Sequence, residues 1–510
     1  MADGNSTDRE DIVTLHELYV DLLVGGLVVL VSIVATRIAD RVGLPSLLAF
    51  LALGVLLGED VLGIKFDDAQ LAQNLGTAAL AVILVEGGLT TSWSDVKAVV
   101  APAGVLATAG VGVSTGVTAL GAHYLLDLGW QQALLLGAIA SSTDAAAVFA
   151  VLRVLPLPRR VAGVLEAESG FNDAPSVILV LVFSETPFHV GAAHLAGTLA
   201  YELAIGAAVG VAVGWLGAMT LQRMALPASG LYPLATFTLG IVAFAAAGAA
   251  HASGFLAAYL AGLVLANSGL PHRAATRSFA EGTAWLAQIG LFVLLGLLVD
   301  PSRLPGQILP ALVVGLVLLL LARPLSVAAS LAAFRTPLRH QVFVSWAGLR
   351  GAVPIVLATF PIVRGVPDSD RLLDIVFVLV VIYTLVQGPS LAPIARWLRL
   401  VPREVTREIL VESAPLDVLD AELLTMTIRP KSRLHSVSIL ELRLPDPSVV
   451  ALVIRDGHTF VPGTHTQLAV GDELLIVTTR RLRAATEKRL RAVSRRGSLA
   501  YWFHEYGEPD

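Results

Sequence analysis

The sequence contains no cysteine, and charged residues make up only 15% of its 510 positions. The absence of cysteine excludes disulfide, iron–sulfur and thiolate chemistry, although it says little about the redox compartment. Soluble proteins carry about 25% charged residues, so a soluble multidomain enzyme is disfavoured. The formal net charge of −5 argues against a nucleic-acid partner.

The few charges are unevenly distributed along the chain. Of the 35 basic and 40 acidic residues, 30 lie after residue 400. Hydrophobic residues form 55% of the chain, and its mean hydropathy is +0.75. The acidic start, with Asp3, Asp8, Glu10 and Asp11 around Arg9, lacks the positive region of a cleaved signal peptide. We therefore predict a membrane body followed by a soluble C-terminal tail.

Thirteen mostly apolar segments are long enough to be candidate membrane helices, because about 20 apolar residues cross a hydrocarbon core. The second and ninth are short and interrupted by glycine, so twelve spans is the alternative. The segments lie at 18–37, 44–58, 71–89, 98–122, 130–152, 160–183, 198–222, 231–249, 253–267, 281–299, 308–333, 341–362 and 373–396.

The loops between these segments differ in basic residues. The loops after odd-numbered segments carry eleven Lys and Arg residues, and the loops after even-numbered segments carry four. Short cytoplasmic loops are enriched in Lys and Arg. The sequence therefore predicts an N-terminus outside and a C-terminal tail in the cytoplasm, and the alternation favours an odd number of spans.

Ionisable residues inside the predicted spans need a reason, because each costs at least about 2.5 kcal/mol at the membrane centre. Most of them lie in two runs, Ser-Ser-Thr-Asp at 141–144 and Glu-Ala-Glu-Ser-Gly-Phe-Asn-Asp at 166–173. The segment at 348–354 adds Gly-Leu-Arg-Gly-Ala-Val-Pro. These runs are the candidate functional region.

The run at 166–173 places several oxygen-bearing side chains on one helix face. Glu166, Ser169, Asn172 and Asp173 recur at spacings of three and four, whereas Glu168 lies to the side. Carboxylate, amide and hydroxyl oxygens suit a small hard cation. One carboxylate that binds either a cation or a proton is the minimal requirement for antiport, and we assign this role to Asp173. A polar cluster that only joins helices is the alternative.

Thr143 adds a hydroxyl or main-chain oxygen to this site if the fifth segment unwinds there. The Ser-Ser-Thr-Asp run is a poor helix former, and Gly348, Gly351 and Pro354 permit a break in the twelfth segment. Broken helices line the midplane sites of many transporters. We expect Asp144 either to cap backbone amides exposed by such a break or to join ion binding.

Arg350 needs a counter-charge inside the membrane. Glu168 is the preferred partner because it points away from the proposed ion face, and the pair has a structural staple as its simplest role. Glu166 and Glu86 are secondary candidates for ion or proton binding. Glu86 lies near the cytoplasmic end of its span, and the alternative to ion binding is that its side chain extends to water at the membrane surface.

The motifs together resemble the monovalent cation:proton antiporter-1 family, the sodium/proton exchanger group, over roughly residues 15–397. The resemblance rests on the runs at 141–144 and 168–173, supported by Gly-Leu-Arg-Gly at 348–351 and Glu-Gly-Gly at 86–88. Their form is closest to the bacterial potassium/proton antiporter branch. The resemblance implies an all-α polytopic membrane protein with about 13 transmembrane helices, inverted repeats and broken crossed helices, assembled as a homodimer.

The resemblance also implies roles for single residues. Asp173 is the transport carboxylate, Asn172 and Asp173 form the pair typical of electroneutral members, and Thr143 and Ser169 join in coordinating the monovalent cation. It further implies the ion pair between Glu168 and Arg350. One departure is the proline at position 175 directly after the pair, which lacks a backbone donor and is expected to affect the helix geometry there.

The soluble tail has the pattern of a small α+β domain. Strands are expected at 422–428, 448–454, 459–461 and 473–478, with a helical stretch at 433–443 and a hairpin turn at 455–458. The stretch resembles the TrkA-C type of regulatory domain, which implies dimerisation and, in some families, cyclic di-AMP or another nucleotide regulator. No other cofactor is expected. A basic helix at 480–496 is predicted to contact anionic lipid or to present a solvated face.

These expectations define five parts. They are an extracytoplasmic tail at 1–17, an exchanger domain at 18–397, a linker at 404–416, a TrkA-C-like domain at 417–490 and a C-terminal tail at 491–510. We expect a multi-pass protein of the bacterial inner (plasma) membrane, exchanging K⁺ or Na⁺ for H⁺ in cation and pH homeostasis and regulated by its tail.

Other classes of protein are less well supported. No Walker loop, nucleotide-binding GxGxxG or nucleophile elbow is present, which disfavours an ATP-driven pump or another enzyme. A tail-gated potassium channel is the alternative, although no TVGYG-like filter is present. A membrane-anchored sensor would not need so many intramembrane polar groups. The choice between K⁺ and Na⁺ stays open.

Overall fold

The computed structural model describes residues 15–42, 45–59, 62–66, 68–144, 148, 155, 157–185, 188, 191–224, 226–401, 411–416, 421–430, 432–479 and 481–496. The chain forms two compact units, Met1–Val401 and Pro402–Asp510. We call them the membrane unit and the C-terminal unit. Most of the predicted N-terminal tail, residues 404–410 of the predicted linker and residues 497–510 lie outside the described residues.

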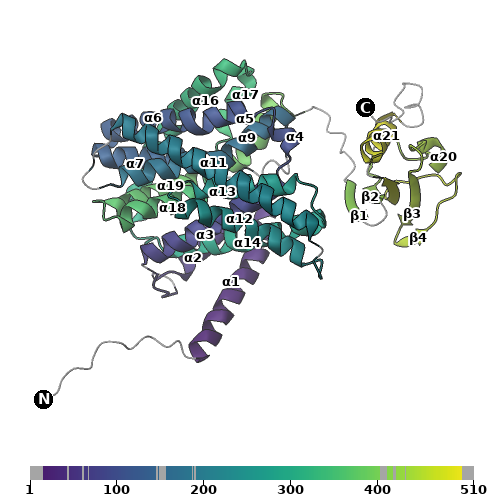
Figure 1. Cartoon of the computed structure of the whole chain (residues 1–510), viewed down its shortest axis with the longest axis horizontal. Coiled ribbons are helices and arrows are strands. Elements are labelled where there is room, and N and C mark those ends of the chain that lie inside the picture. The colour runs from purple at the N-terminus through teal and green to yellow at the C-terminus, as the bar shows by residue number, and fades with distance from the viewer. Residues whose placement is uncertain are drawn as a thin grey trace. The chain divides into compact units, whose positions relative to one another are not determined.

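The membrane unit is helical throughout its described regular structure (Figure 1). Several long helices contain a short π or 3-10 segment, labelled η. The elements are α1 (Leu15–Val42), α2 (Ser46–Leu57), α3 (Ala69–Thr90), α4 (Trp93–Val96), α5 (Val100–Val105), η1 (Leu106–Gly110), α6 (Val111–Leu126), α7 (Trp130–Ser141), α9 (Arg159–Phe171), α10 (Asp173–Phe183), α11 (Ala192–Arg223), α12 (Leu231–Ala249), α13 (Gly254–Ala266), α14 (Arg273–Leu297), η2 (Leu304–Gln307), α15 (Ile308–Val317), η3 (Leu318–Ala322), α16 (Arg323–Leu331), η4 (Ala332–Phe334), α17 (Leu338–Trp346), α18 (Ala352–Val363) and α19 (Ser369–Trp397).

Eight stretches of the described chain are long and apolar enough to cross a membrane. Shorter apolar helices occur at Ser46–Leu57, Gly254–Ala266 and Ala352–Val363. Each of the thirteen predicted segments overlaps a helix, and the short second and ninth segments correspond to α2 and α13. The polytopic, mostly helical fold is therefore confirmed, whereas the count of thirteen spans stays a prediction.

The breaks predicted from the polar runs are present. The helix α7 ends at Ser141, and Ser142 is extended with φ −69° and ψ 142°. The helices α17 and α18 are separated by residues 347–351, which contain two glycines. Asn172 joins α9 to α10, and Pro175 lies in the first turn of α10. The Asn172 backbone is itself helical (φ −76°, ψ −19°), and Pro175 has no amide hydrogen to donate to the carbonyl of Phe171, four residues earlier at the end of α9.

Contacts between elements divide the membrane unit into two bundles. The helices α1–α3 and α11–α14 pack together as the first bundle, and α5–α7, α9 and α10 pack with α15–α19 as the second bundle. The bundles meet where α9 and α10 lie against α13 and where α18 lies against α3. Within the second bundle, the stretches 100–126 and 304–334 each contain a five-residue π segment and each precede a broken helix, as expected of a structural repeat.

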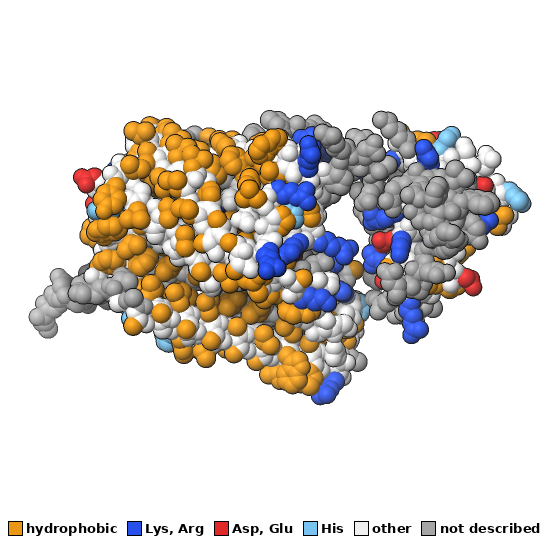
Figure 2. Space-filling view, turned by 90° about the horizontal axis from the view of Figure 1, so that it is seen from above, with side chains coloured by type: hydrophobic (Ala, Val, Ile, Leu, Met, Phe, Trp, Pro, Cys, Tyr) orange, Lys and Arg blue, Asp and Glu red, His pale blue; other side chains and the backbone are white. Residues whose placement is uncertain are grey.

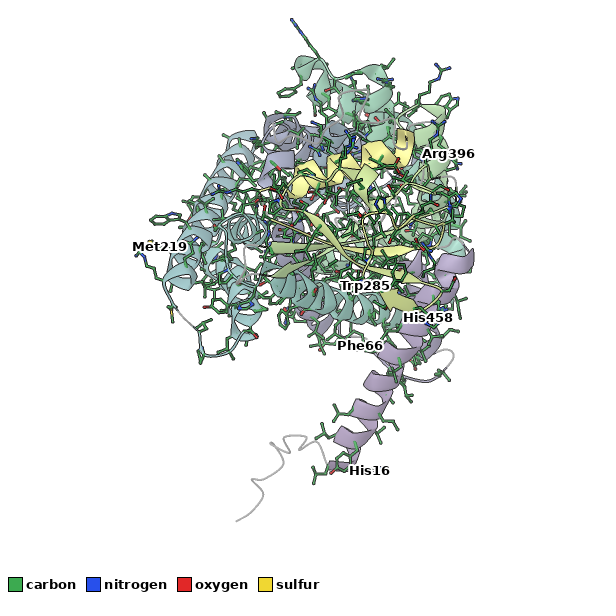
Figure 3. All side chains as sticks on the ribbon, turned by 90° about the vertical axis from the view of Figure 1, so that its right-hand side faces the viewer. His16, Phe66, Met219, Trp285, Arg396 and His458 are labelled. Carbon is green, nitrogen blue, oxygen red and sulfur yellow. The ribbon has the colours of Figure 1, made fainter. Side chains whose placement is uncertain are left out.

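Apolar side chains cover much of the outer surface of the membrane unit. Figure 2 shows them spread over its wide face, with Lys and Arg gathered at one end. The helix α1 extends away from the other helices (Figure 1), and His16 lies near its outer end (Figure 3). Only 6% of the apolar window of α1 is buried within the unit. Such a surface requires lipid or another protein around it.

The C-terminal unit is a five-stranded antiparallel sheet with helices. Its elements are β1 (Val411–Leu416), β2 (Ala421–Thr427), α20 (Ile439–Leu442), β3 (Val449–Arg455), β4 (His458–Phe460), β5 (Glu473–Thr479) and α21 (Arg483–Arg496), and the strand order is β1-β2-β5-β3-β4. The core places Leu424, Leu474 and Ile476 of the sheet against Leu490 and Val493 of α21. The predicted small α+β domain is thus present.

Two details of the C-terminal unit differ from expectation. Residues 411–416, expected to be linker, form β1, and only four residues of the helical stretch predicted at 433–443 are helical. The short helix begins with a capping box between Ser438 and Glu441 and ends at Leu442, before Arg443, whose φ is 44°. The hairpin turn is as predicted, with Asp456 and Gly457 at φ 51° and 79° between β3 and β4.

Candidate functional site

The broken ends of α7 and α18 meet through Asp144. The Asp144 amide donates to the Leu349 carbonyl at 3.0 Å, and the Ala352 amide donates to Asp144 Oδ2 at 3.1 Å. The Asp144 carboxylate therefore caps the start of α18, one of the two roles considered for it. A Cβ on Gly351 would lie 1.6 Å from Asp144 Oδ2, so only glycine leaves room for this cap.

Asn172, at the junction of α9 and α10, bonds to the chain just after the end of α7. Its Nδ2 donates to the hydroxyl of Thr143, and both side chains are buried, at 0% and 1% relative exposure. Their neighbour Asp173 is 3% exposed. Among the described residues, Asn172 Oδ1 and Asp173 Oδ1 have no hydrogen-bond partner. Two buried oxygens thus remain available beside the Thr143 hydroxyl.

Asp173 occupies a position suited to a carboxylate that alternates between charge states. It lies in the first turn of α10, where the helix dipole favours negative charge. It also interacts electrostatically with Asp144. Two nearby carboxylates repel each other, and binding a cation or a proton relieves that repulsion. Buried oxygens without partners cost free energy unless a ligand satisfies them.

Ser169 is buried one turn before Asp173, and its hydroxyl donates to the Glu166 carbonyl at 3.1 Å. The hydroxyl oxygen keeps lone pairs that can accept a cation. Within the described ranges, no three His, Cys, Asp or Glu side chains are grouped to hold a metal ion. A cation at this site would therefore use mixed carboxylate, amide and hydroxyl oxygens.

The prediction that Glu168 pairs with Arg350 was wrong, because Glu168 pairs with Arg323 instead. Arg323, at the start of α16, forms two hydrogen bonds with the Glu168 carboxylate, Nη1–Oε1 at 2.6 Å and Nη2–Oε2 at 2.7 Å. The side chains are 6% and 2% exposed. Arg323 directly follows a π segment and lies inside the second bundle, where its guanidinium faces Glu168 of α9. Its position well inside the apolar segment 308–333 was the available signal.

The Arg350 guanidinium bonds to a backbone carbonyl instead of to a carboxylate. Its Nη1 donates to the Ser142 carbonyl, one of the acceptors released where α7 ends, and its residue exposure is 2%. The Thr384 hydroxyl donates to the Arg350 carbonyl at 3.2 Å. Glu168 acts on the Arg350 charge electrostatically. Arg350 thus stabilises the break in α7, while Arg323 neutralises Glu168.

The secondary candidates Glu166 and Glu86 lie in α9 and α3. Glu166 Oε1 accepts a hydrogen bond at 2.8 Å from Thr91, which follows α3 in the first bundle. Glu86 is 4% exposed, so its side chain does not reach out to water as the alternative required. Sequence reasoning missed Arg323, Thr91 and Tyr259, whose hydroxyl donates to Thr91 at 3.4 Å.

Known proteins resemble the chain over most of its length. Residues 27–397 match the family described as "Sodium/hydrogen exchanger, transmembrane", and residues 423–491 match the TrkA-C domain. The chain is 39% identical over 473 residues to the K(+)/H(+) antiporter NhaP of Alkalimonas amylolytica, covering 91% of this chain and 82% of that protein. It is 36% identical over 482 residues to the K(+)/H(+) antiporter NhaP2 of Shewanella oneidensis, covering 92% and 82%.

The fold is similar to that of the sodium proton antiporter MjNhaP1 from Methanocaldococcus jannaschii, with a TM-score of 0.64 at 21% sequence identity. The similarity covers 75% of this chain and 99% of that chain. At this identity the structural likeness shows the fold alone. The resemblance predicted from the motifs is confirmed by the family match and by the curated relatives. The chain belongs to the transmembrane sodium/hydrogen exchanger family and carries a TrkA-C domain in its C-terminal unit.

Proposed function

We propose that this protein is a secondary active antiporter that exchanges a monovalent cation, K⁺ or Na⁺, for H⁺ across the membrane. The observation that carries the proposal is the buried Asp173 carboxylate, whose Oδ1 has no partner among the described residues, beside the hydrogen-bonded pair of Asn172 and Thr143. The names of the relatives support K⁺ as the cation. No enzymatic activity is proposed.

In the proposed cycle, Asp173 carries either a proton or a cation but not both. When Asp173 is ionised, its oxygens, Asn172 Oδ1 and the hydroxyls of Thr143 and Ser169 replace water around the cation. When Asp173 is protonated, the site is neutral and the cation leaves. Coupling requires that the empty, charged site does not cross, because moving a bare charge through the membrane is costly.

The surrounding charges are proposed to keep this one site in control of transport. The buried pair of Glu168 and Arg323 is internally neutral, and the Asp144 carboxylate accepts a hydrogen bond from the Ala352 amide at the start of α18. One carboxylate that gains a cation as it loses a proton keeps the charge of the loaded site constant. The exchange is therefore one for one and electroneutral.

The setting of the protein is part of the proposal. The N-terminus lies outside, the C-terminal unit lies in the cytoplasm, and the protein functions as a homodimer in the bacterial inner membrane. The TrkA-C domain regulates exchange, and cyclic di-AMP or another nucleotide is its candidate ligand. The gathering of Lys and Arg at one end of the membrane unit (Figure 2) supports this orientation.

The test is exchange by the purified full chain in liposomes that contain a pH-sensitive dye. Asp173→Asn removes the ionisable group at almost constant volume, so we expect it to abolish cation-driven proton movement. The control is Asp127→Asn, since Asp127 lies in an exposed loop with φ 55°, a conformation that Asn tolerates. Full coupled exchange by Asp173→Asn would contradict the assignment of the transport carboxylate.

A further inference from the structure

The two bundles are joined by side-chain contacts at one end of the Asp173 region. Glu166 lies two helical turns before Asp173 along α9, towards the basic residues Arg159 and Arg160. Its carboxylate Oε1 lies at hydrogen-bond distance, 2.8 Å, from the Thr91 hydroxyl of the first bundle, which shares its single proton with the Gly87 carbonyl at 2.6 Å. Thr91 is 0% exposed. Under the proposed orientation, this contact lies on the cytoplasmic side of the site.

Thr91 and Tyr259 are held firmly within the first bundle. A Cβ on Gly88 of α3 would lie 2.3 Å from the Tyr259 carbonyl, and a Cβ on Gly262 of α13 would lie 2.8 Å from the Val85 carbonyl. The backbones of α3 and α13 are therefore in direct contact, which explains the glycines of the Glu-Gly-Gly motif. This packing places the Tyr259 hydroxyl 3.4 Å from Thr91 Oγ1.

The second bundle packs closely on the Tyr259 ring. A Cβ on Gly170 would lie 2.6 Å from a ring carbon of Tyr259. The next residue, Phe171, meets the same ring edge to face, with centroids 5.5 Å apart and planes at 82°. Tyr259 is 0% exposed. The segment of α9 from Glu166 to Phe171 therefore packs in direct contact with Tyr259 and Thr91.

At the other end of the same boundary a hollow opens between the bundles. It measures about 490 Å³ and is lined by Asn74 and Thr77 of α3, Leu181 of α10, Phe360 of α18 and Arg364, which follows α18. Leu181 follows Asp173 by eight residues, about 12 Å along a helix. A second hollow of about 260 Å³ lies between the ends of α2 and α14 and the start of α19. Both hollows lie on the side of Asp173 opposite to Glu166.

We propose that the contact of Glu166 with Thr91 and Tyr259 is the gate that closes the cytoplasmic path to Asp173. Glu166 is then a positioning residue that joins the bundles, and not a ligand of the transported cation. The contact breaks when the second bundle moves relative to the first, which exposes Asp173 to the cytoplasm. This inference rests on the proposed antiport function and names the closure that alternating access requires.

The absence of native cysteine allows a direct test in the full chain. A single cysteine is introduced at Ser169, which is 1% exposed between Glu166 and Asp173. Its modification by a membrane-impermeant maleimide is timed in inside-out and right-side-out vesicles. Thr91→Val is then added to remove the gate hydroxyl at nearly constant volume. The matched control is Thr115→Val, since Thr115 bonds to Ser141 at 3.1 Å within the second bundle.

Loss of one hydrogen bond shifts a two-state equilibrium by about fivefold. We therefore expect Thr91→Val to raise the modification rate in inside-out vesicles by about fivefold, with no rise in right-side-out vesicles or with Thr115→Val. An unchanged rate with Thr91→Val, or an equal rise with Thr115→Val, would overturn the gate. This readout needs no transport. If the rate rises but the native chain, with Ser169 intact, shows no exchange, the gate stands and the proposed function fails.

A second measurement locks the gate. Thr91→Cys and Glu166→Cys are joined by a short reducible methanethiosulfonate cross-linker, and exchange is measured before and after reduction. We expect exchange to stop on cross-linking and to return on reduction. The pair Tyr201→Cys and Ala250→Cys, joined within the first bundle where the Tyr201 hydroxyl donates to the Ala250 carbonyl at 3.1 Å, is expected to exchange in both states. Undiminished exchange by the cross-linked Thr91→Cys and Glu166→Cys protein would contradict the proposal.

Discussion

Arg323 and Glu168 form a two-hydrogen-bond ion pair in the interior of the membrane unit, with Nη–Oε distances of 2.6 and 2.7 Å. The residues are 155 positions apart in the sequence and join α16 to α9. Bidentate geometry matches the fixed fork of a guanidinium to a carboxylate, and each charge satisfies the other. This pair holds two helices of the second bundle together directly beside the proposed transport site.

Removing one member of the pair should destabilise the protein. Arg323→Gln leaves the Glu168 carboxylate buried without its partner, which costs about 3–5 kcal/mol in buried pairs. We expect a lower melting temperature of the detergent-solubilised full chain, with partial recovery when Glu168→Gln is added. Glu185→Gln, on an exposed residue, is the control. Unchanged melting of Arg323→Gln would show that the pair is not a structural element.

Gly351 is predicted to tolerate no side chain. The added Cβ of Gly351→Ala would lie 1.6 Å from Asp144 Oδ2, so Asp144 must release the Ala352 amide. Loss of a helix cap costs about 0.5–2 kcal/mol, and displacing the break adds to this cost. We expect a lower melting temperature and loss of exchange in liposomes. Gly112→Ala is the control, since a Cβ there meets no atom within 4 Å. Equal melting temperatures and equal exchange in the two variants would contradict the requirement for glycine at position 351.

The stability of the C-terminal unit should depend on acid pH through Asp472. Burial raises the pKa of this carboxyl, but hydrogen bonds from Arg455 and from the Ala469 amide, together with the Arg455 charge, outweigh it and lower the pKa. Arg455 bonds both carboxylate oxygens at 2.7 Å. Because the folded pKa is lowered, the stabilisation is complete above the unfolded pKa of about 3.9 and is lost as pH falls through the folded value.

Hydrogen–deuterium exchange of the full chain can measure this dependence. We expect Asp472→Asn to speed amide exchange in β5 at neutral pH and to weaken the loss of protection on acidification. Asp456→Asn is the matched control, because Asp456 lies in the neighbouring turn at φ 51°, where Asn is well tolerated. Equal protection of β5 in the Asp472→Asn and parent proteins would contradict the assigned role of the ion pair.

The sequence predicted local features of the site better than its partners. The spacing of Ser169, Asn172 and Asp173 indicated one helix face, and the Ser-Ser-Thr-Asp run indicated a break, because both depend on neighbouring residues. The partner of Glu168 depends on which helices meet in the second bundle. Arg323 follows a π segment in a run of apolar residues, and such a run has no polar periodicity to show which way a side chain faces. Partner choice was therefore beyond local reasoning.

The C-terminal unit illustrates the same limit. The strand β1 contains Pro415, which lowers strand propensity, yet β1 is an edge strand of the sheet, where proline is tolerated. A helix was predicted at 433–443, but the observed helix has one turn, because the capping box of Ser438 and Glu441 sets its start. That capping box was visible in the sequence. The strand β1 depended on its pairing with β2, which no local pattern reveals.

The central claim is coupled exchange of a monovalent cation for protons. The most direct measurement reconstitutes the full chain in liposomes with an internal pH dye, imposes gradients of K⁺, Na⁺ or Li⁺ in turn, and varies the membrane potential. Parallel samples contain cyclic di-AMP. We expect proton movement driven by K⁺ or Na⁺, one for one and independent of the potential. A dye response insensitive to every cation, or cation flux that follows the potential without proton movement, would contradict it.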